Sequence, residues 1–462
     1  MTRWNSTALV ALFLGCLAGC SGSAGAGGAL AGALPGTATT DSSSSGYGVI
    51  KHVIVVIQEN RSFDNFFATY PGADGALSGE TSDGSTVPLA PIALKSRLVL
   101  DNSFLAFQVD YDGGKMDQFN LVTVNPHERR CTCVYAYVRR GDIEPYWTMA
   151  RQYVLGDHMF TTEASGSFTG HQDLIRGSAE LSSGISLIDF PTSEPWGCDA
   201  PTGTVTTLLT STTLLPGSWK YQANKGPFPC LSYATLRDLL DAKGVTWKYY
   251  TPAVHDPDNG GQVWDAFDAI SAVRNGPEWN TNVSSPNTNF FSDVSANALP
   301  AVSWVVPDGQ NSDHPAQQFW HVSSDTGPSW VASIVNAIGR SPYWNSTAIV
   351  VVWDDWGGWY DHVPPPQLDY KGLGFRVPLL VISPYAKAGY VSHTQYESGS
   401  ILRFIEDTFG LGRLGTSDTR ANSIADAFDF GASPRKFKTI PAKYSKSFFL
   451  HQKPSNIPVD TQ

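Results

Sequence analysis

The chain has 462 residues, enough for one large domain or several smaller ones. Its aromatic content of 12% excludes a mostly disordered chain, a coiled coil and a collagen-like fibre. With 42 acidic and 31 basic residues the net charge is −11, and an acidic surface repels nucleic-acid backbones. We therefore expect no nucleic acid among its partners.

The first segment of the chain has the pattern of an export signal. Arg3 supplies a positive charge, and an apolar run from Ala8 to Leu17 leads to Leu17-Ala18-Gly19-Cys20. A run this short is typical of a secretion signal rather than of a membrane span. The small residues before Cys20 resemble a bacterial lipobox, which implies lipidation of the Cys20 thiol; an ordinary secretion signal is the alternative. We predict a signal peptide over residues 1–19 and an exported protein, either lipid-anchored to the cell envelope or secreted.

The next segment predicts a linker, followed by one domain. Residues 20–48 begin with the lipidated cysteine and are almost entirely Gly, Ala, Ser and Thr. Such a stretch cannot bury a core, so it predicts a flexible tether between the lipid and the folded part. No break in composition follows, and we expect a single domain over residues 49–462. Long Gly- and Pro-rich segments between 180 and 300 are interpreted as insertions.

Four cysteines remain once Cys16 is removed and Cys20 is lipidated, and they allow three pairings. We favour Cys198–Cys230, because both residues lie in loop-like Pro- and Gly-rich surroundings. A bridge between Cys131 and Cys133 would span a single Thr and would be strained. Disulfides suit an exported protein better than a zinc site, which needs other spacing and nearby histidines.

Short apolar, β-branched runs are the clearest predictors of local structure. Continuous hydrophobicity of this kind is typical of strands that are buried on both faces. Apolar residues recur at helical spacing in two segments, 330–338 and 401–409, which predicts a helix in each. Strands interleaved with helices predict an α/β fold with a largely parallel central sheet flanked by helices. The four predicted strands cover residues 52–57, 301–306, 347–352 and 377–382.

Polar side chains follow three of the predicted strands. The first strand leads into Glu59 and Asn60, the second into Asp313 and His314, and the third into an adjacent pair of aspartates at 354 and 355. Open parallel sheets place their sites at the carboxyl ends of strands. Adjacent acids repel each other and lose solvation unless a cation lies between them. Solvated loop acids that cap turns are the alternative, but three such strand ends together favour a metal site.

A candidate nucleophile lies in the segment 165–172, SGSFTGHQ. An amphipathic stretch at 145–155 precedes it and a helix is predicted to follow, so Ser167 would be the N-cap residue. Backbone N–H groups and the helix dipole stabilise an anion there, which suits a hydroxyl that attacks phosphorus. The alternative is a serine that only caps the helix. The segment does not match the Gly-x-Ser-x-Gly turn of α/β-hydrolases.

Three motifs resemble those of the bacterial phosphoesterase family, which contains non-haemolytic phospholipases C and a periplasmic acid phosphatase. Residues 52–65, HVIVVIQENRSFDN, resemble its opening motif. Residues 353–365, WDDWGGWYDHVPP, and 374–385, GFRVPLLVISPY, resemble its second and third blocks. The similarity runs from about 50 to 430. It implies an alkaline-phosphatase-like α/β fold with one site for a divalent metal ion.

The resemblance also assigns roles to individual residues. It implies that Glu59, Asn60, Asp354 and Asp355 are metal ligands, and that Ser167 is the nucleophile and also contacts the metal. His314 would bind the phosphate and protonate the leaving group. These ligands are all oxygen donors, which favours Ca²⁺, Mg²⁺ or Mn²⁺ over zinc, without fixing the identity of the metal.

The sequence also departs from the family pattern. Many members carry a histidine-rich segment where this chain has residues 101–105, DNSFL. If a phosphate-binding histidine is normally there, His255, His171 or His127 must substitute for it. His362, which lies next to the acidic pair, is equally consistent with structural support and with catalysis.

These residues together predict a secreted, metal-dependent phosphoesterase. We expect hydrolysis of a phosphate ester or a phospholipid, as a phospholipase C or an acid phosphatase, through a phosphoserine intermediate. Membrane association would come from the N-terminal lipid. The alternative is a catalytically inactive lipoprotein that uses the same pocket to bind a lipid or a glycan.

Overall fold

The structure is a computed structural model that describes residues 46–462 apart from 126–130, 257–259, 318–320, 456 and 460–462. The predicted signal peptide, the Cys20 lipidation site and nearly all of the tether lie outside the described residues, and so does His127. The described residues belong to one structural unit, Gly46–Gln462. Among them, no helix combines the length and the apolar character that crossing a membrane requires.

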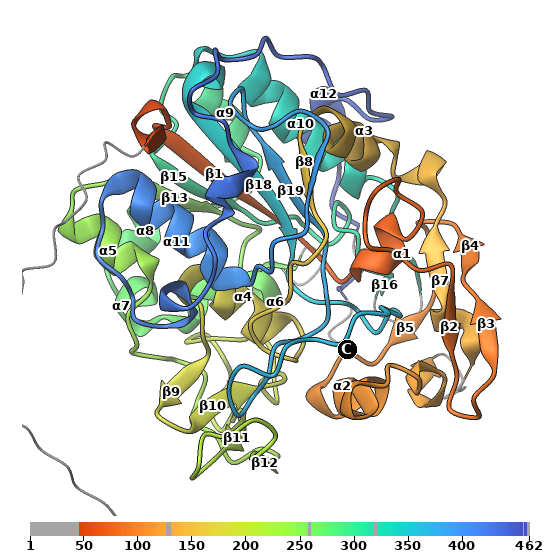
Figure 1. Ribbon diagram of the computed structural model, residues 1–462. Helices are drawn as coiled ribbons and strands as arrows, with labels where there is room; N and C mark the ends of the chain where they lie inside the picture. The colour runs from red at the N-terminus through yellow and green to blue at the C-terminus, as the bar shows by residue number, and fades with distance from the viewer. Residues whose placement is uncertain (1–45, 126–130, 257–259, 318–320, 456, 460–462) are drawn as a thin grey trace, which may run out of the picture. The chain divides into compact units, whose positions relative to one another are not determined.

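The centre of the fold is an eight-stranded sheet (Figure 1). β19 pairs antiparallel with β18 and with β8, and the other neighbouring pairs in this sheet are parallel. The predicted α/β fold with a largely parallel sheet is therefore confirmed. The strands lie in the order β14 (Val283–Ser284), β13 (Trp247–Tyr250), β15 (Val302–Val305), β1 (His52–Gln58), β18 (Thr347–Trp353), β19 (Leu379–Ile382), β8 (Val154–Gly156) and β20 (Tyr390–Ser392).

All four runs that were predicted as strands are strands of this sheet. β1 lies between β15 and β18, so that Val55 is opposite Trp304 on one side and Val350 on the other. Every residue of β15, β18 and β19 is buried, as is every residue of β1 after His52. The run at 377–382 forms the reversed strand β19. Hydrophobicity predicts burial but carries no information on strand direction, so the sequence did not reveal this reversal.

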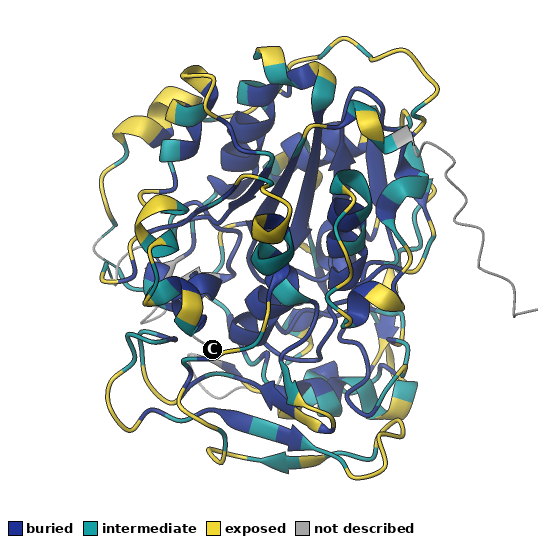
Figure 2. Ribbon diagram, turned by 90° about the vertical axis from the view of Figure 1, so that its left-hand side faces the viewer, coloured by how far each residue is buried: buried dark blue, intermediate teal, exposed yellow. Residues whose placement is uncertain are grey.

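Helices cover both faces of the sheet, and Figure 2 shows its strands as buried ribbons between them. The helices predicted at 145–155, 330–338 and 401–409 are confirmed, with shifted ends. On one face α10 (Gly327–Gly339) contacts α3 (Glu144–Gln152), α9 (Asn289–Ser295) and α12 (Lys446–His451). On the other face α4 (Ser167–Arg176) contacts α11 (Ser398–Phe409), α5 (Leu236–Ala242) and α6 (Gly261–Trp264), with α7 (Ser271–Arg274) and α8 (Glu278–Thr281) beyond them.

The segment 180–300 is only partly an insertion. It contributes β13 and β14, which form one edge of the central sheet. The remainder includes a separate antiparallel sheet in the order β12 (Lys220–Gln222), β11 (Thr207–Thr210), β10 (Ile185–Ile188) and β9 (Glu180–Ser182). Short strands between turns in a Gly- and Pro-rich sequence give a weak hydrophobic pattern, which is why the edge strands were missed.

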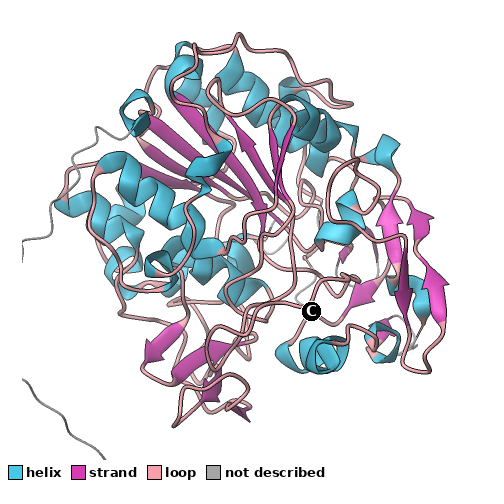
Figure 3. Ribbon diagram, in the orientation of Figure 1, coloured by secondary structure: helices cyan, strands magenta, loops and turns pink. Residues whose placement is uncertain are grey.

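Smaller elements surround the carboxyl end of β1, and Figure 3 shows their strands apart from the central sheet. α1 (Phe63–Phe67) begins soon after β1. α2 (Phe104–Tyr111) comes later in the chain, after four short strands. The two-stranded pairs are β2 (Ser78–Glu80) with β3 (Thr86–Pro88), β4 (Ala90–Ile92) with β7 (Ala136–Val138), β5 (Val99–Leu100) with β6 (Val124–Asn125), and β16 (Ala316–Gln317) with β17 (His321–Val322).

The four cysteines of the described residues form two disulfides. Cys198 is bonded to Cys230, as the sequence favoured. Cys131 is bonded to Cys133, a second bridge that the sequence did not favour. The Cα atoms of this second pair are 5.2 Å apart, a separation that a disulfide spans.

Candidate active site

Two neighbouring parallel strands deliver the predicted metal ligands to one place. Gln58, the last residue of β1, is opposite Trp353, the last residue of β18. The residues that follow therefore leave the sheet side by side, and the Asp354 N–H donates to the Gln58 carbonyl at 3.0 Å. The four side chains at positions 59, 60, 354 and 355 are buried. The sequence correctly predicted that these two strand ends meet.

The backbone around Asn60 is shaped to hold the two aspartates. Asn60 has a positive φ of 54°, its backbone N–H donates to Asp354 Oδ1 at 3.1 Å, and its Nδ2 donates to Asp355 Oδ2 at 3.3 Å. Gly357 lies against it, and a Cβ at this glycine would be 2.3 Å from the Asn60 carbonyl oxygen. Only glycine fits this approach, and the Gly357 N–H donates to Asp355 Oδ1 at 2.7 Å.

Ser167 lies at the start of α4 and contacts the same carboxylate. Its Oγ donates to Asp355 Oδ2 at 3.2 Å, and the side chain is buried. The N-cap residue is Gly166, so the prediction that Ser167 is the N-cap is wrong by one position. A Cβ at position 166 would be 2.3 Å from the ring of Phe190 and would crowd Asn102, which explains why glycine is there. Ser167 is thus the first helical residue, beside the unpaired N–H groups of the first turn.

His171 lies one turn further along α4 and faces the acids. Its Nε2 is 2.9 Å from Glu59 Oε1 and 3.9 Å from Asp354 Oδ2. These three residues offer one ligand atom each, all within 4.8 Å of one another. Of the two proposed substitutes that the structure describes, His171 and His255, His171 lies in this site. His255 is 74% exposed and pairs with Asp199 at 3.1 Å.

Asn102 occupies the position at which the sequence lacks a histidine. Its Nδ2 donates to both oxygens of Asp355, at 3.1 and 3.0 Å, while its Oδ1 is buried without a partner. The motif lacks a histidine here, and nothing in the local sequence indicated that the asparagine itself enters the site. The only available signal was its place in the family motif, because an asparagine before a helix is usually a capping residue.

The electrostatics of the site are those of crowded, desolvated acids. Burial raises the pKa of Glu59 well above its usual value, and the neighbouring Asp354 carboxylate raises it further. Burial and Asp354 likewise raise the pKa of Asp355. Burial lowers the pKa of His171 to about 4, so this imidazole is neutral at neutral pH. In the part of the chain that the structure describes, no Lys or Arg forms an ion pair with these acids.

The site fits a hard divalent cation. Four buried oxygens have no hydrogen-bond partner within the described structure, namely Glu59 Oε2, Asn60 Oδ1, Asn102 Oδ1 and Asp354 Oδ2. Unsatisfied buried acceptors are rare in proteins and each requires an explanation. Carboxylate and amide oxygens are the ligands that Ca²⁺ and Mg²⁺ prefer, and a cation would balance the uncompensated negative charge. The described residues therefore meet the chemical requirements of the metal that the family resemblance implies.

His314 lies in the loop that follows β15. A hydrogen bond joins this loop to the end of β1, since the Asp313 N–H donates to Gln58 Oε1 at 3.0 Å. The His314 ring centroid is 6.3 Å from that of Trp264, and its backbone N–H donates to Ser312 Oγ at 3.4 Å. Neither of these contacts involves Ser167. The role of His314 as a proton donor stays a prediction.

His362 belongs to a different group of residues. Its Nδ1 is 2.7 Å from Asp64 Oδ2, and its Nε2 is 3.2 Å from Asp74 Oδ1. Arg376 completes this group through an ion pair with Asp361 at 2.9 Å. These contacts support the structural alternative for His362.

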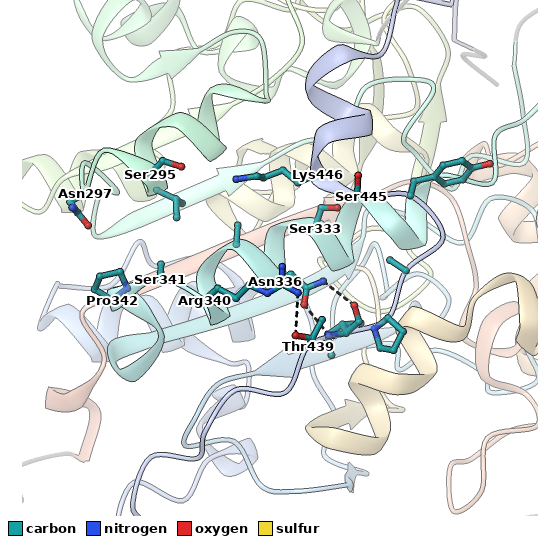
Figure 4. A pocket seen from close by; sticks show the side chains of 16 residues that line it. Ser295, Asn297, Ser333, Asn336, Arg340, Ser341, Pro342, Thr439, Ser445 and Lys446 are labelled. Atoms are coloured by element: carbon teal, nitrogen blue, oxygen red, sulfur yellow. Dashed lines mark hydrogen bonds between the residues drawn. The ribbon is translucent and has the colours of Figure 1, made fainter.

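A surface cavity of about 600 Å³ lies elsewhere, between α9, α10 and residues 439–446 (Figure 4). Asn336 of α10 and Arg340, which follows the helix, donate hydrogen bonds to the C-terminal segment along its wall. Its lining contains no carboxylate and no histidine. The cavity therefore lacks the carboxylates and imidazoles that a metal-dependent phosphoesterase site needs, and the buried acids at the strand ends remain the candidate active site.

The fold and the site together define a class of protein: an α/β protein with a serine hydroxyl and a set of buried oxygen ligands at the carboxyl end of its central strands. Comparison with known proteins gives the family. The phosphoesterase family model matches residues 50–412, and the chain belongs to this family. The resemblance seen in the sequence motifs is confirmed.

Individual relatives extend over most of the chain. Phospholipase C B of Mycobacterium tuberculosis is 25% identical over 449 residues, covering 84% of this chain and 79% of the relative. Non-hemolytic phospholipase C of Pseudomonas aeruginosa is 24% identical over 455 residues, covering 85% of this chain and 59% of the relative. A solved structure of a protein in the alkaline phosphatase superfamily from Vibrio parahaemolyticus is 12% identical with a TM-score of 0.38, covering 82% of this chain and 72% of that protein.

Proposed function

We propose that the protein is an exported, metal-dependent hydrolase of phosphoric esters, of the phospholipase C type, with Ser167 as its nucleophile. The observation that carries the proposal is the hydrogen bond from Ser167 Oγ to Asp355, at the N-terminus of α4 and within the buried acidic centre. The names of the relatives support phospholipid as the substrate, and an acid phosphatase activity is the second candidate. The N-terminal pattern and the two disulfides support export, with Cys20 as the lipid anchor.

Glu59, Asn60, Asp354 and Asp355 would hold the divalent cation, with Ser167 beside it. When bound, the cation supplies positive charge that neutralises the phosphate oxygens. Asn102 fixes Asp355 by donating to both of its carboxylate oxygens. His171 fixes Glu59 through the hydrogen bond between its Nε2 and Glu59 Oε1 at 2.9 Å. These positioning contacts come from segments far apart in the sequence, so the centre requires the complete fold.

The chemistry proceeds in two displacements at phosphorus. Ser167 Oγ attacks phosphorus in line with the leaving alcohol, and the hydroxyl proton passes to Asp355 Oδ2. The N–H groups at the start of α4 stabilise the negative charge that develops on the serine and phosphate oxygens. As the bond to the alcohol breaks, His314 donates a proton to the departing oxygen. A water molecule then gives a proton to His314 and attacks phosphorus, which breaks the bond to Ser167 Oγ. The serine oxygen takes back its proton from Asp355, and the phosphate product leaves.

Serine substitutions separate a nucleophile from a simple structural residue. Ser167→Ala should lower kcat by several orders of magnitude with a small change in melting temperature, whereas Ser167→Thr should retain measurable activity. Thr169→Ala is the matched control, because Thr169 is buried in the same turn of α4 and its hydroxyl bonds to the Gly166 carbonyl. A phosphoserine at Ser167, trapped by acid quench and seen by mass spectrometry, would identify the covalent intermediate. Normal turnover by Ser167→Ala would refute the proposal.

The substrate class is tested with two chromogenic esters. Hydrolysis of p-nitrophenylphosphorylcholine would support the phospholipase C activity, and preference for p-nitrophenyl phosphate would support a phosphatase. Turnover of neither ester, at any pH and with any of Ca²⁺, Mg²⁺ or Mn²⁺, would favour the inactive lipid- or glycan-binding lipoprotein.

A further inference from the structure

The antiparallel sheet β9–β12 lies next to the candidate active site. Its β12 packs on the start of α2, where the ring centroids of Phe104 and Trp219 are 4.8 Å apart. Asp189, which follows β10, accepts hydrogen bonds from the Phe104 N–H at 2.6 Å and from the Tyr221 hydroxyl at 2.7 Å. Phe104 is two residues from Asn102, whose amide binds Asp355. The sheet and α2 therefore pack together beside the segment that carries Asn102, at the bottom of Figure 1.

Large apolar side chains are exposed along one edge of this surface. Leu214 and Leu215, in the loop between β11 and β12, are 45% and 64% exposed. A Cβ at Gly184, in the turn between β9 and β10, would be 3.1 Å from Leu214 Cδ2, so the two turns lie together. Ile185, the first residue of β10, is 37% exposed. We call Ile185, Leu214 and Leu215 the leucine edge. The adjacent helix α2 adds Leu105, which is 49% exposed.

The charge around the leucine edge differs from that of the whole chain. Residues 200–235 contain no Asp or Glu, although the chain has 42 acidic residues and a net charge of −11. They contain Lys220 and Lys225, both exposed, and neither forms an ion pair among the described residues. Trp219 and Tyr221 are half-buried beside them. Leucine, tryptophan, tyrosine and lysine together are the combination that proteins use at a lipid–water interface.

We propose that the leucine edge docks on a lipid bilayer that carries anionic headgroups, and thereby holds the candidate active site close to the membrane. This rests on the proposed function, because docking at this edge serves an enzyme whose substrate is a phospholipid. Two exposed leucines at a loop tip gain from entering the headgroup–acyl boundary, and the two lysines complement anionic lipid. The rest of this acidic protein is repelled by such a surface, which orients the molecule with residues 200–235 toward the bilayer.

Vesicle binding by the full chain tests the proposal. Cys20→Ser is present in every sample, so that no N-terminal lipid contributes. The probes are vesicles of phosphatidylcholine and of an equal mixture of phosphatidylcholine and phosphatidylglycerol, measured by co-sedimentation. Binding to the mixed vesicles should exceed binding to phosphatidylcholine alone and should weaken with added salt. Leu214→Ser with Leu215→Ser should weaken it at least about tenfold. Lys220→Gln with Lys225→Gln should remove the preference for the anionic vesicles.

A matched control lies at the other end of the molecule. Leu450 of α12 is 44% exposed, close to the exposure of Leu214, and α12 is opposite β9–β12 in Figure 1. Leu450→Ser should leave vesicle binding unchanged. The leucine-edge variant should keep its melting temperature and its turnover of the soluble p-nitrophenyl ester, while its hydrolysis of vesicle phospholipid falls with binding.

Three outcomes would overturn the proposal. The first is that the protein with an unsubstituted leucine edge does not bind vesicles, and the second is that Leu450→Ser loses as much binding as the leucine-edge variant. The third is that the leucine-edge substitutions dissociate a homodimer without any change in vesicle binding. The last would show that a second copy of the chain covers the edge. The proposed function can fail separately from membrane docking. Vesicle binding that depends on the two leucines, without hydrolysis of any ester, would support the docking surface and contradict the proposed enzymatic activity.

Discussion

Two groups of buried acids lie close together beyond the ends of β1 and β18, and they differ in how their charge is balanced. The first group consists of Glu59, Asp354 and Asp355, which contact amides, a hydroxyl and the neutral ring of His171. Burial and mutual repulsion raise the pKa values of Glu59 and Asp355 well above the usual range. This group lacks a protein cation among the described residues.

The second group is neutralised by the protein itself. Arg376 is fully buried and pairs with Asp361 at 2.9 Å and with Asp64 at 3.5 Å. His362 adds a second partner for Asp64, at 2.7 Å. The comparison shows that burial of acids does not by itself identify a functional site. Acids that the fold leaves uncompensated need an external cation, whereas acids paired with arginine support the structure.

The largest expected effect is the loss of the buried arginine. Arg376→Leu leaves Asp361 buried without its arginine and Asp64 with His362 alone, and should destabilise the protein by about 3–5 kcal/mol. Urea unfolding in the presence of EDTA measures the change. Asp361→Asn is the milder companion, because it keeps one partner for Arg376. A cost as small as that of an average surface substitution would show that the second group is not held together by this ion pair.

Removing a charged side chain from the first group should instead stabilise the metal-stripped protein. Glu59→Gln replaces a buried acid whose ionised form is destabilised, and it keeps a polar partner for His171 Nε2, so we expect the metal-stripped protein to gain roughly 1 kcal/mol at neutral pH. Stabilisation by added Ca²⁺, Mg²⁺ or Mn²⁺ and turnover should both be lost. Retention of full activity in this variant would exclude Glu59 as a ligand.

The pH dependence of the metal-stripped protein follows from the raised pKa values of Glu59 and Asp355. Above the ordinary carboxyl pKa of 4.5 the folded protein binds more protons than the unfolded chain does. The free energy of unfolding should therefore fall as pH rises from that value toward the raised pKa values. Saturating cation should flatten this decline, because it stabilises the ionised carboxylates. Melting temperatures measured across this range, with and without the cation, check the prediction, and a rising stability would contradict it.

The smallest expected effect concerns His362. Burial lowers its pKa, but the carboxylates of Asp64 and Asp361 outweigh burial, and the pKa of His362 lies above its usual 6.5. Its charged form therefore stabilises the protein below pH 6.5, and this contribution disappears as pH rises through the raised value. His362→Gln should cost about 1 kcal/mol at acidic pH and less at alkaline pH. If His362→Gln lowers the free energy of unfolding equally at all pH values, the ring stabilises the protein by packing and not by its charge.

The sequence predicted the parts of the site that lie directly after buried strands. The runs at 52–57 and 347–352 are strongly apolar, so the positions of Glu59 and Asp355 at neighbouring strand ends followed from the parallel pairing. The segment around Ser167 also located the start of α4 to within one residue. Local patterns of this kind are sufficient when the element is buried and the functional residue is next to it.

The remaining features depend on contacts between distant segments. Asn102 reaches Asp355 across a separation of 253 residues, and nothing in its own neighbourhood predicts that contact. Whether His171 or His362 serves the site depends on which carboxylates each meets, and that depends on packing. The reversal of β19 and the joining of β13 and β14 to the sheet are likewise set by tertiary pairing. Propensity and hydrophobic periodicity carry no information on these choices.

Calorimetric titration of the metal-stripped protein with Mn²⁺, Mg²⁺ or Ca²⁺ shows whether the uncompensated acids bind a divalent cation. The account predicts saturable binding at one site with release of protons, seen as a heat that varies with the ionisation enthalpy of the buffer. Glu59→Gln and Asp354→Asn should abolish this binding, and His362→Gln should leave it intact. Binding that is absent in the unsubstituted protein, or equally strong in Glu59→Gln, would contradict the account.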